Sequence, residues 1–421
     1  MPSSVPSRWI RSLLRSLGPG IITGAADDDP SGIATYSVAG AQLGTTLLWT
    51  ALLTWPLMAA VQMMCARIGK VTGKGLAGNF KQRFPKWLLL AFAIALLIAN
   101  TINIAADLAG MADAAAMLSG IKSYWFVVAF ALLISWATVR LQYRQIANVL
   151  KWLVLVLFAY PITAFVVGAD WGQVLRDTLV PSIPHSRNEW ATLVAILGTT
   201  ISPYLFFWQA SEEVEEEKSA GQSTLALRRG ATSEELDMRN IDVGVGAFFS
   251  NMVMFFIILT TAITLHRHGI TNIETSRQAA EALAPFAGKF AATLFTLGIV
   301  GVGFLAIPTL AGSTSYAFAE TLGWRQGLNK NLSGARWFYA LILVSTAAGV
   351  ALNFLGINPV KALYWTAVIN GLLAPFLLVA ILMIAADKKL MQGQPSSRLG
   401  WTLVAITTAA MFAAGVAMFV V

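Results

Sequence analysis

Eleven long apolar segments make up most of the 421-residue chain. They cover roughly residues 19–41, 45–66, 87–118, 123–140, 146–168, 190–212, 240–265, 289–319, 337–356, 359–386 and 399–421. About 20 consecutive apolar residues are enough to cross a bilayer as a helix. Only 12% of the residues are charged, against about 25% in soluble domains. The pattern therefore predicts an all-α polytopic membrane protein.

The Lys and Arg residues are distributed unevenly among the connecting loops. If the N-terminal segment, residues 1–18, lies in the cytoplasm, only seven of the 29 basic residues fall in outside loops: Lys122, Arg176, Arg187, Arg267, Arg277, Lys289 and Lys361. An excess of basic residues in cytoplasmic loops is the usual orientation signal. We therefore expect a bacterial-type inner-membrane protein with its N-terminus in the cytoplasm and its C-terminus outside. The net charge of +8 reports this topology, and no nucleic-acid partner is predicted.

Two of the apolar segments contain helix-breaking residues. The first contains "AADDDPSGIA", in which Pro30 follows three acids, and the sixth contains "GTTISPYLFF" with Pro203. Proline removes a helical hydrogen bond and clashes with the preceding turn. Interrupted segments in corresponding positions of two halves indicate a transporter with inverted repeats and a site at the bilayer midplane. The alternative is a pair of ordinary proline kinks.

Because the breaks fall in spans one and six, the repeat would be five helices plus five. This predicts a first repeat at 19–168, an outside loop at 169–189 and a second repeat at 190–386, followed by an inside loop and an eleventh helix at 387–421.

The three consecutive acids raise a question of cost. A carboxylate at mid-bilayer costs at least ~2.5–3.5 kcal/mol on insertion scales, and successive helical residues point about 100° apart. The three side chains therefore cannot all face one cavity. Asp29, immediately before the break, is best placed to bind a substrate or ion. Asp27 and Asp28 are predicted to line a hydrated approach or to lie against a neighbouring helix.

Three blocks resemble the Nramp family of divalent-metal transporters. "LGPGIITGAADDDPSGIATYSVAGAQLG" is similar to the family's first span, with Gly-Pro-Gly and then Asp-Pro-Gly-Asn. "AADLAG" at 105–110 resembles the third-span Asp-Leu-Ala-Glu, and "ISPYL" at 201–205 falls where the family has Met-Pro-His-Asn. The spacing of the blocks fits over nearly the whole chain. The resemblance implies the LeuT fold, alternating access, and import of Mn²⁺, Fe²⁺ and related ions, usually with protons.

The resemblance keeps two carboxylates and loses most of their partners. The family's binding aspartate matches Asp29, and its third-span aspartate matches Asp107. The Asn ligand falls on Gly32, the Met ligand on Ser202, and the residue that offers a backbone carbonyl on Thr199. Where the family has its sixth-span His, its third-span Glu and its tenth-span Gln, this chain has Tyr204, Gly110 and Ala367.

These departures favour a hard cation. Thioether sulfur suits soft metals, whereas carboxylate, carbonyl and water suit Mg²⁺, Ca²⁺ and Mn²⁺. The predicted metal-binding set is all oxygen, with Asp29 as the metal ligand: Asp29, Ser202, Thr199, Ser31, Asp28 and the backbone at Gly32. The family includes a Mg²⁺-carrying branch without the methionine, which this chain resembles in its sixth span. We expect Mg²⁺ or Mn²⁺ as the transported substrate, in preference to Fe²⁺, and no resident cofactor.

Proton coupling is expected to be weak or absent, because the family's His and Glu are missing and Asp107 is the remaining candidate proton acceptor. The membrane potential alone supplies about 2.3 kcal/mol per charge per 100 mV.

An alternative on the same fold is a carrier of a small carboxylate, a bicarbonate-like anion or a neutral solute. The half-helix after Pro30 would offer free N–H groups and a positive dipole end to an anion. An enzyme is not predicted, because all three histidines, His185, His266 and His268, fall in outside loops. Cys65 is the single cysteine, which excludes an internal disulfide. The expected partners are the solute and the bilayer, and the oligomeric state is open but compatible with a monomer.

Two further polar features receive structural interpretations. The acidic run "ASEEVEEEK" at 210–218 is predicted to be a solvated helix face paired with Arg228, Arg229 and Arg239. Asn103 and Asn370 are interpreted as buried amides that join helices, with Asn370 as an alternative contributor to the site.

Overall fold

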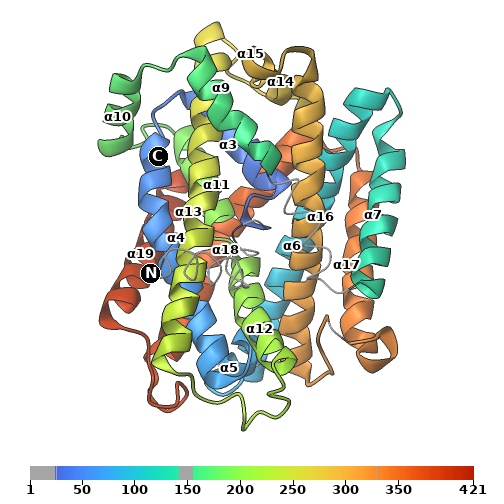
Figure 1. The fold of residues 1–421 in the computed structure, drawn as a ribbon, viewed down its shortest axis with the longest axis vertical. Coiled ribbons are helices and arrows are strands. Elements are labelled where there is room, and N and C mark those ends of the chain that lie inside the picture. The colour runs from blue at the N-terminus through green and yellow to red at the C-terminus, as the bar shows by residue number, and fades with distance from the viewer. Residues whose placement is uncertain (1–23, 25, 142–154, 329) are drawn as a thin grey trace, which may run out of the picture.

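The computed structural model describes residues 24, 26–141, 155–328 and 330–421 (Figure 1). Within these residues every regular element is helical. Nine helical stretches are long and apolar enough to cross a bilayer: Leu48–Thr72, Lys86–Ser119, Ser123–Arg140, Arg187–Ser219, Ser233–His268, Ala284–Leu322, Arg336–Asn353, Pro359–Ala386 and Arg398–Val420. The prediction of an all-α polytopic protein is confirmed. The remaining two predicted spans, the first and the fifth, lie partly outside the described residues, as does the whole segment 1–18.

The elements follow one another along the chain as a series of long helices with short helices between them. The first half contains α3 (Pro30–Leu43), α4 (Leu48–Thr72), α5 (Leu76–Phe80), α6 (Lys86–Ser119), α7 (Ser123–Arg140), η1 (Leu155–Phe158), α9 (Ala159–Val167) and α10 (Trp171–Leu179). The second half contains α11 (Arg187–Thr200), α12 (Pro203–Ser219), α13 (Ser233–Thr264), η2 (His266–His268), α14 (Ser276–Glu281), α15 (Ala284–Ala287), η3 (Gly288–Phe290), α16 (Ala291–Leu322), η4 (Leu332–Gly334), α17 (Arg336–Asn353), α18 (Pro359–Ala386) and α19 (Arg398–Val420).

Both predicted helix breaks are present. Pro30 opens α3 directly after the non-helical Asp28 and Asp29, and Pro203 opens α12 two residues after α11 ends. Proline suits the first position of a helix because its fixed φ matches the helix and its missing N–H would be unpaired there. The same prolines therefore end one half-helix and start the next. The division into two repeats stays a prediction.

The half-helices pack closely on their neighbours because glycines lie at the contacts. A Cβ added to Gly198 of α11 would overlap the backbone of Ala367 and Gly371 in α18. A Cβ added to Gly40 of α3 would overlap the carbonyl of Ile258 in α13. Small residues of this kind let membrane helices approach to backbone contact. They place α3 and α11 against the helices that surround the site.

One end of the molecule collects many basic residues, and we call it the basic end. It comprises α5, the neighbouring ends of α4, α12 and α16, and the loops 220–232, 323–335 and 387–397 (Figure 1, lower part). Hydrogen bonds tie these parts together: Arg67 donates to the Gln394 carbonyl, and Glu320 of α16 accepts from the backbone N–H groups of Gly75 and Gly78. Of the loops predicted to be cytoplasmic, those that the structure describes thus lie at a common end.

A buried ion-pair network joins α12 to α13 at the basic end. Arg239 Nε lies 2.9 Å from Glu213, its Nη1 lies 2.7 Å from Asp242, and its Nη2 pairs with Glu216. Gln209 Nε2 donates to Glu213 at 2.8 Å. The pairing of the acidic run with Arg239 is confirmed.

The expected solvation of that run is wrong. Glu213, Glu215 and Glu217 are buried, because α12 packs between α4 and α16. Arg228 donates instead to backbone carbonyls of residues 222 and 223.

Candidate functional site

Asp29 lies at the break of the first span, where three helices meet. Its backbone is extended and caps α3, and its Oδ1 accepts a 2.6 Å hydrogen bond from the Gly32 N–H. Its Oδ2 accepts from Asn103 Nδ2 of α6 at 3.1 Å and from the Tyr204 hydroxyl of α12 at 3.5 Å. The carboxylate is buried. It is thus directed to the centre of the bundle, as the sequence predicts.

The α6 wall of the site carries buried oxygens that have no hydrogen-bond partner. Asn103 and Asp107 are one helical turn apart, so they share a face of α6. Neither the Asp107 carboxylate oxygens nor the Asn103 Oδ1 has a partner at full hydrogen-bond geometry, and Asp107 interacts with the Asp29 carboxylate and with the Ser31 backbone N–H. Unsatisfied buried oxygens are costly unless something outside the protein satisfies them.

The facing wall comes from the break of the sixth span, between α11 and α12. An added Cβ at Gly32 would lie 3.1 Å from Thr199 Oγ1, so the threonine hydroxyl occupies the space beside Gly32. Ser202 donates to the Gly198 and Thr199 carbonyls, each at 2.7 Å. The serine proton therefore holds the end of α11, while lone pairs on its oxygen remain for a ligand. Thr199 thus lies beside the Asp29 half-helix, and Ser202 lies at the break between α11 and α12.

Ser31 is directed elsewhere. Its hydroxyl donates to the Leu363 carbonyl at 2.9 Å and lies 3.1 Å from Thr366 Oγ1, so it ties α3 to α18. The structure therefore gives Ser31 a joining role between helices.

Asp27 and Asp28 face α13. Ser250 Oγ donates to Asp27 Oδ2 at 2.5 Å and to Asp28 Oδ1 at 3.2 Å. Both carboxyl groups are buried, so of the two predicted placements the structure shows the one against a neighbouring helix and not the hydrated approach. The prediction that three consecutive acids diverge is confirmed, since Asp29 faces α6 and α12. Asp28 accordingly lies on the α13 side of the break.

The electrostatics of this region are unusual. None of the buried carboxyl groups of Asp27, Asp28, Asp29 and Asp107 forms an ion pair with Lys, Arg or His in the described ranges. Nor do the described residues contain a cluster of three or more His, Cys, Asp or Glu side chains that could hold a metal. Buried carboxylates without a basic partner are strongly disfavoured unless a cation or a proton neutralises them.

Sequence reasoning missed two members of the site. Asn103 contacts Asp29 directly, although we expected it only to join helices, and the Tyr204 hydroxyl donates both to Asp29 and to the Ala26 carbonyl. The four-residue spacing between Asn103 and Asp107 is a signal that would have found the first. Asn370 is buried in α18 with an unpartnered Oδ1, which leaves its predicted role open.

Two departures from the family pattern have a structural basis. A Cβ at Gly110 would lie 2.8 Å from Leu363 Cδ1, so the Leu363 side chain of α18 lies against the position where the family has a glutamate. Tyr204 occupies the position of the family's histidine, and its hydroxyl is bound as described above. Neither position offers an ionisable group with a pKa near neutrality.

Comparison with known proteins identifies the family. The family model "Natural resistance-associated macrophage protein-like" (Nramp) matches residues 20–421. The chain belongs to the Nramp family. It is 28% identical over 416 residues to the divalent metal cation transporter MntH of Caldanaerobacter subterraneus, covering 94% of this chain and 91% of the relative. It is 30% identical over 318 residues to MntH of Yersinia pestis, covering 73% of each.

The Nramp fold is also found among solved structures. The manganese transporter of Eremococcus coleocola superposes with a TM-score of 0.77 at 19% identity, covering 99% of this chain and 89% of that one. This establishes the LeuT-type fold that the sequence predicts. As an Nramp protein, the chain is a multi-pass membrane transporter and not an enzyme.

Proposed function

We propose that this Nramp protein is a secondary transporter of a hard divalent cation, Mg²⁺ or Mn²⁺, which binds at Asp29 between the broken helices. The observation that carries the proposal is the set of buried carboxyl groups without a basic partner among the described residues. A divalent cation between Asp29 and Asp107 would balance both charges. It would also satisfy the orphan oxygens of Asp107 and Asn103.

The donor set favours a hard cation. Asp29, Asp107, Thr199, Ser202 and Asn103 offer carboxylate, hydroxyl and amide oxygens. Mg²⁺ is held by one or two carboxylates and keeps several waters, and Mn²⁺ accepts the same donors. The amide oxygen that the family supplies at position 32 is absent, but the Thr199 hydroxyl lies beside Gly32. Asn103 reaches the Asp29 carboxylate with its amide nitrogen, and its Oδ1 has no partner.

The anion alternative is opposed by the same geometry. The N–H of Gly32, which an anion would use at the start of α3, already donates to Asp29. A bound carboxylate or bicarbonate would have to lie against Asp29 and displace that bond, with no Lys or Arg ion pair in the described structure to offset the repulsion.

The proposal is tested by uptake into proteoliposomes. Purified protein is reconstituted, and Mg²⁺, Mn²⁺ and Ca²⁺ fluxes are measured in parallel with uptake of labelled bicarbonate and acetate. We expect saturable Mg²⁺ or Mn²⁺ uptake and no anion uptake above that of empty vesicles. Anion uptake without divalent uptake would replace the proposal by its alternative.

The missing methionine gives a selectivity prediction. Replacing Ser202 by Met should place a thioether at the break of α11 and α12, where it favours soft cations. We expect the Cd²⁺-to-Mg²⁺ uptake ratio to rise about tenfold, within the range by which changes around a metal site alter affinity. Ser202→Leu is the matched control, because it has similar volume and also loses the bonds to Gly198 and Thr199. An equal rise in the Leu variant would show that sulfur is not responsible.

Uncoupled transport gives a second prediction. We propose that proton coupling is weak or absent, because Gly110 and Tyr204 replace the family's ionisable groups. With an inside-negative potential of 100 mV, a divalent ion gains about 4.6 kcal/mol, which corresponds to accumulation on the order of 10³-fold. Uptake should therefore follow an imposed potential, and a pH dye inside the vesicles should report no acidification. Acidification in proportion to metal uptake would instead establish a symporter.

The orientation follows from the charge distribution. We propose that the basic end faces the cytoplasm, by the excess of Lys and Arg in its loops. The N-terminus would then be inside and the C-terminus outside, in an inner membrane.

A further inference from the structure

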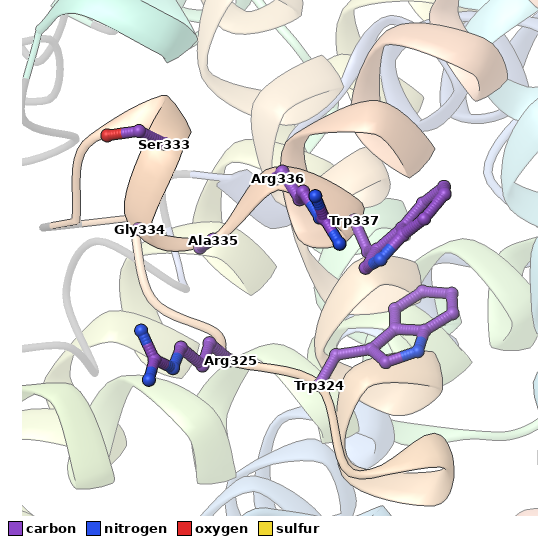
Figure 2. Close-up of a pocket in the computed structure, with 7 residues that line it drawn as sticks. All are labelled: Trp324, Arg325, Ser333, Gly334, Ala335, Arg336 and Trp337. Carbon is purple, nitrogen blue, oxygen red and sulfur yellow. The ribbon is translucent and has the colours of Figure 1, made fainter.

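A cavity lies at the basic end, lined by residues far along the chain from Asp29. This cavity of about 310 Å³ separates the end of α16 from the start of α17, and its lining includes Trp324, Arg325, Ser333, Arg336 and Trp337 (Figure 2). We call it the α16–α17 pocket. None of these residues belongs to the Nramp site described above.

The pocket is built for an anion. Arg325 and Arg336 are both exposed, and neither is paired with a carboxylate within the described part of the chain. The 18-residue helix α17 begins at the pocket, and no side chain caps its N-terminus. Its first N–H groups are thus unpaired by any cap and carry the positive end of the helix dipole. Arg336 lies at this terminus, and Arg325 lines the other side of the pocket (Figure 2), so the pocket joins two cationic side chains to a helix terminus that attracts phosphate.

The aromatic residues show where the pocket lies in the membrane. The Trp324 and Trp337 rings lie 6.2 Å apart, and the Arg336 guanidinium sits 5.4 Å from the centre of the Trp337 ring (Figure 2). Trp337 is 54% exposed. Exposed tryptophans at the ends of spanning helices lie at the level of the lipid headgroups. The pocket therefore opens at the membrane–water interface.

Exposed apolar side chains lie on the elements that flank the pocket. Leu322, at the end of α16, and Val344, two turns into α17, are exposed, as is Leu332 in the connecting loop. Helix α17 lies at the flank of the bundle beside α7 (Figure 1). A ligand with a phosphate in the pocket would thus have an exposed helix surface for an acyl chain.

We propose that the α16–α17 pocket binds the phosphate of an anionic phospholipid. Arg336 and the N-terminus of α17 would contact the phosphate, Arg325 would approach it from the other side of the pocket, and Trp324 and Trp337 would flank the glycerol region. The pocket lies at the end that the positive-inside pattern assigns to the cytoplasmic leaflet, where anionic lipids are recognised by juxtamembrane basic residues. Binding would join the ends of α16 and α17 and so stabilise this end of the transporter.

The test is native mass spectrometry of the full-length protein with equimolar phosphatidylglycerol and phosphatidylcholine. We expect preferential retention of phosphatidylglycerol by the wild type. The Arg325→Gln/Arg336→Gln double variant should bind it on the order of 10-fold more weakly. Lys388→Gln/Lys389→Gln is the matched control, because it removes the same charge from another loop of the basic end and should retain wild-type binding.

Two outcomes would overturn the proposal. Equal phosphatidylglycerol retention by the wild type and the Arg325→Gln/Arg336→Gln variant would exclude the pocket. Displacement of the lipid by millimolar inorganic phosphate would show that the pocket takes a soluble anion. Thermal unfolding of each variant in phosphatidylcholine alone verifies that it is folded, which is expected because both arginines are exposed.

Discussion

Replacing Asp29 by Asn should abolish transport while leaving the protein folded. The amide keeps the shape of the side chain and can still accept from the Gly32 N–H, so α3 should keep its cap. It removes the charge that holds the cation. Changes to residues that merely support a metal ligand cost 10- to 100-fold in affinity, so loss of the ligand itself should reduce Mg²⁺ or Mn²⁺ uptake by at least about 100-fold.

Asp113→Asn is the matched control for this variant. Asp113 also lies in α6, but its carboxylate accepts from the Ser276 N–H at 3.2 Å and lines a different cavity with Tyr124 and Asn353. Uptake by this variant should stay near the wild-type rate. If both variants lost transport equally, a general effect of removing membrane carboxylates would explain the result. The assignment of Asp29 as the metal ligand would then lose its support.

Replacing Arg239 by Gln should cause the largest loss of stability. Arg239 is the basic group between Glu213, Glu216 and Asp242, and Glu213 is fully buried. Removing one partner of a buried ion pair typically costs about 3–5 kcal/mol, because the remaining carboxylates then repel one another in a poorly solvated place. We expect a lower midpoint of thermal unfolding in detergent and a lower yield of folded protein.

The Arg239 prediction has a control and a rescue. Arg229→Gln removes an exposed arginine nearby and should change the free energy of unfolding by less than about 0.5 kcal/mol. Adding Glu213→Gln to Arg239→Gln removes the most buried of the carboxylates, so it should recover part of the lost stability. An unfolding midpoint for Arg239→Gln equal to that of the wild type would show that the network contributes nothing to stability.

The helix breaks could be predicted because they depend on local chemistry. Pro30 and Pro203 each remove a helical hydrogen bond and have a glycine nearby that weakens the helix further, whereas Pro56, Pro308 and Pro375 lie inside continuous helices. The 100° rotation between neighbours already requires Asp27 to Asp29 to diverge. The direction in which each acid points could not be predicted. Ser250, which donates to Asp27 and Asp28, comes more than 200 residues later in the chain. No local sequence pattern connects it to the two acids.

The types of oxygen donor in the site could be predicted from the sequence, but the positions of only some of them could. Thr199 and Ser202 lie at the second break because the break itself is local. The close contact of Thr199 with Gly32 depends on how α3 and α11 pack. Ser31 carries the same hydroxyl as Ser202 but binds α18, and Asn103 reaches Asp29 from α6. Residue type alone does not distinguish these cases, since each depends on which helix is adjacent.

The burial of the acidic run at 210–218 shows the same limit. Five acids in a short segment are typical of a solvated face, yet Glu213 is enclosed because Arg239 lies across from it on α13. Arg239, which carries the compensating charge, was among the predicted partners of the run. That it lets Glu213 be buried could not be predicted, because this depends on how α12 and α13 are arranged.

The most direct test of the central claim is isothermal titration of the purified protein with Mg²⁺, beside the Asp29→Asn variant. If a hard divalent cation binds between the broken helices, the wild type should show saturable binding of one ion, and the variant should show none. Equal binding by both proteins, or no binding of Mg²⁺ or Mn²⁺ by the wild type, would contradict the assignment of Asp29 as the metal ligand.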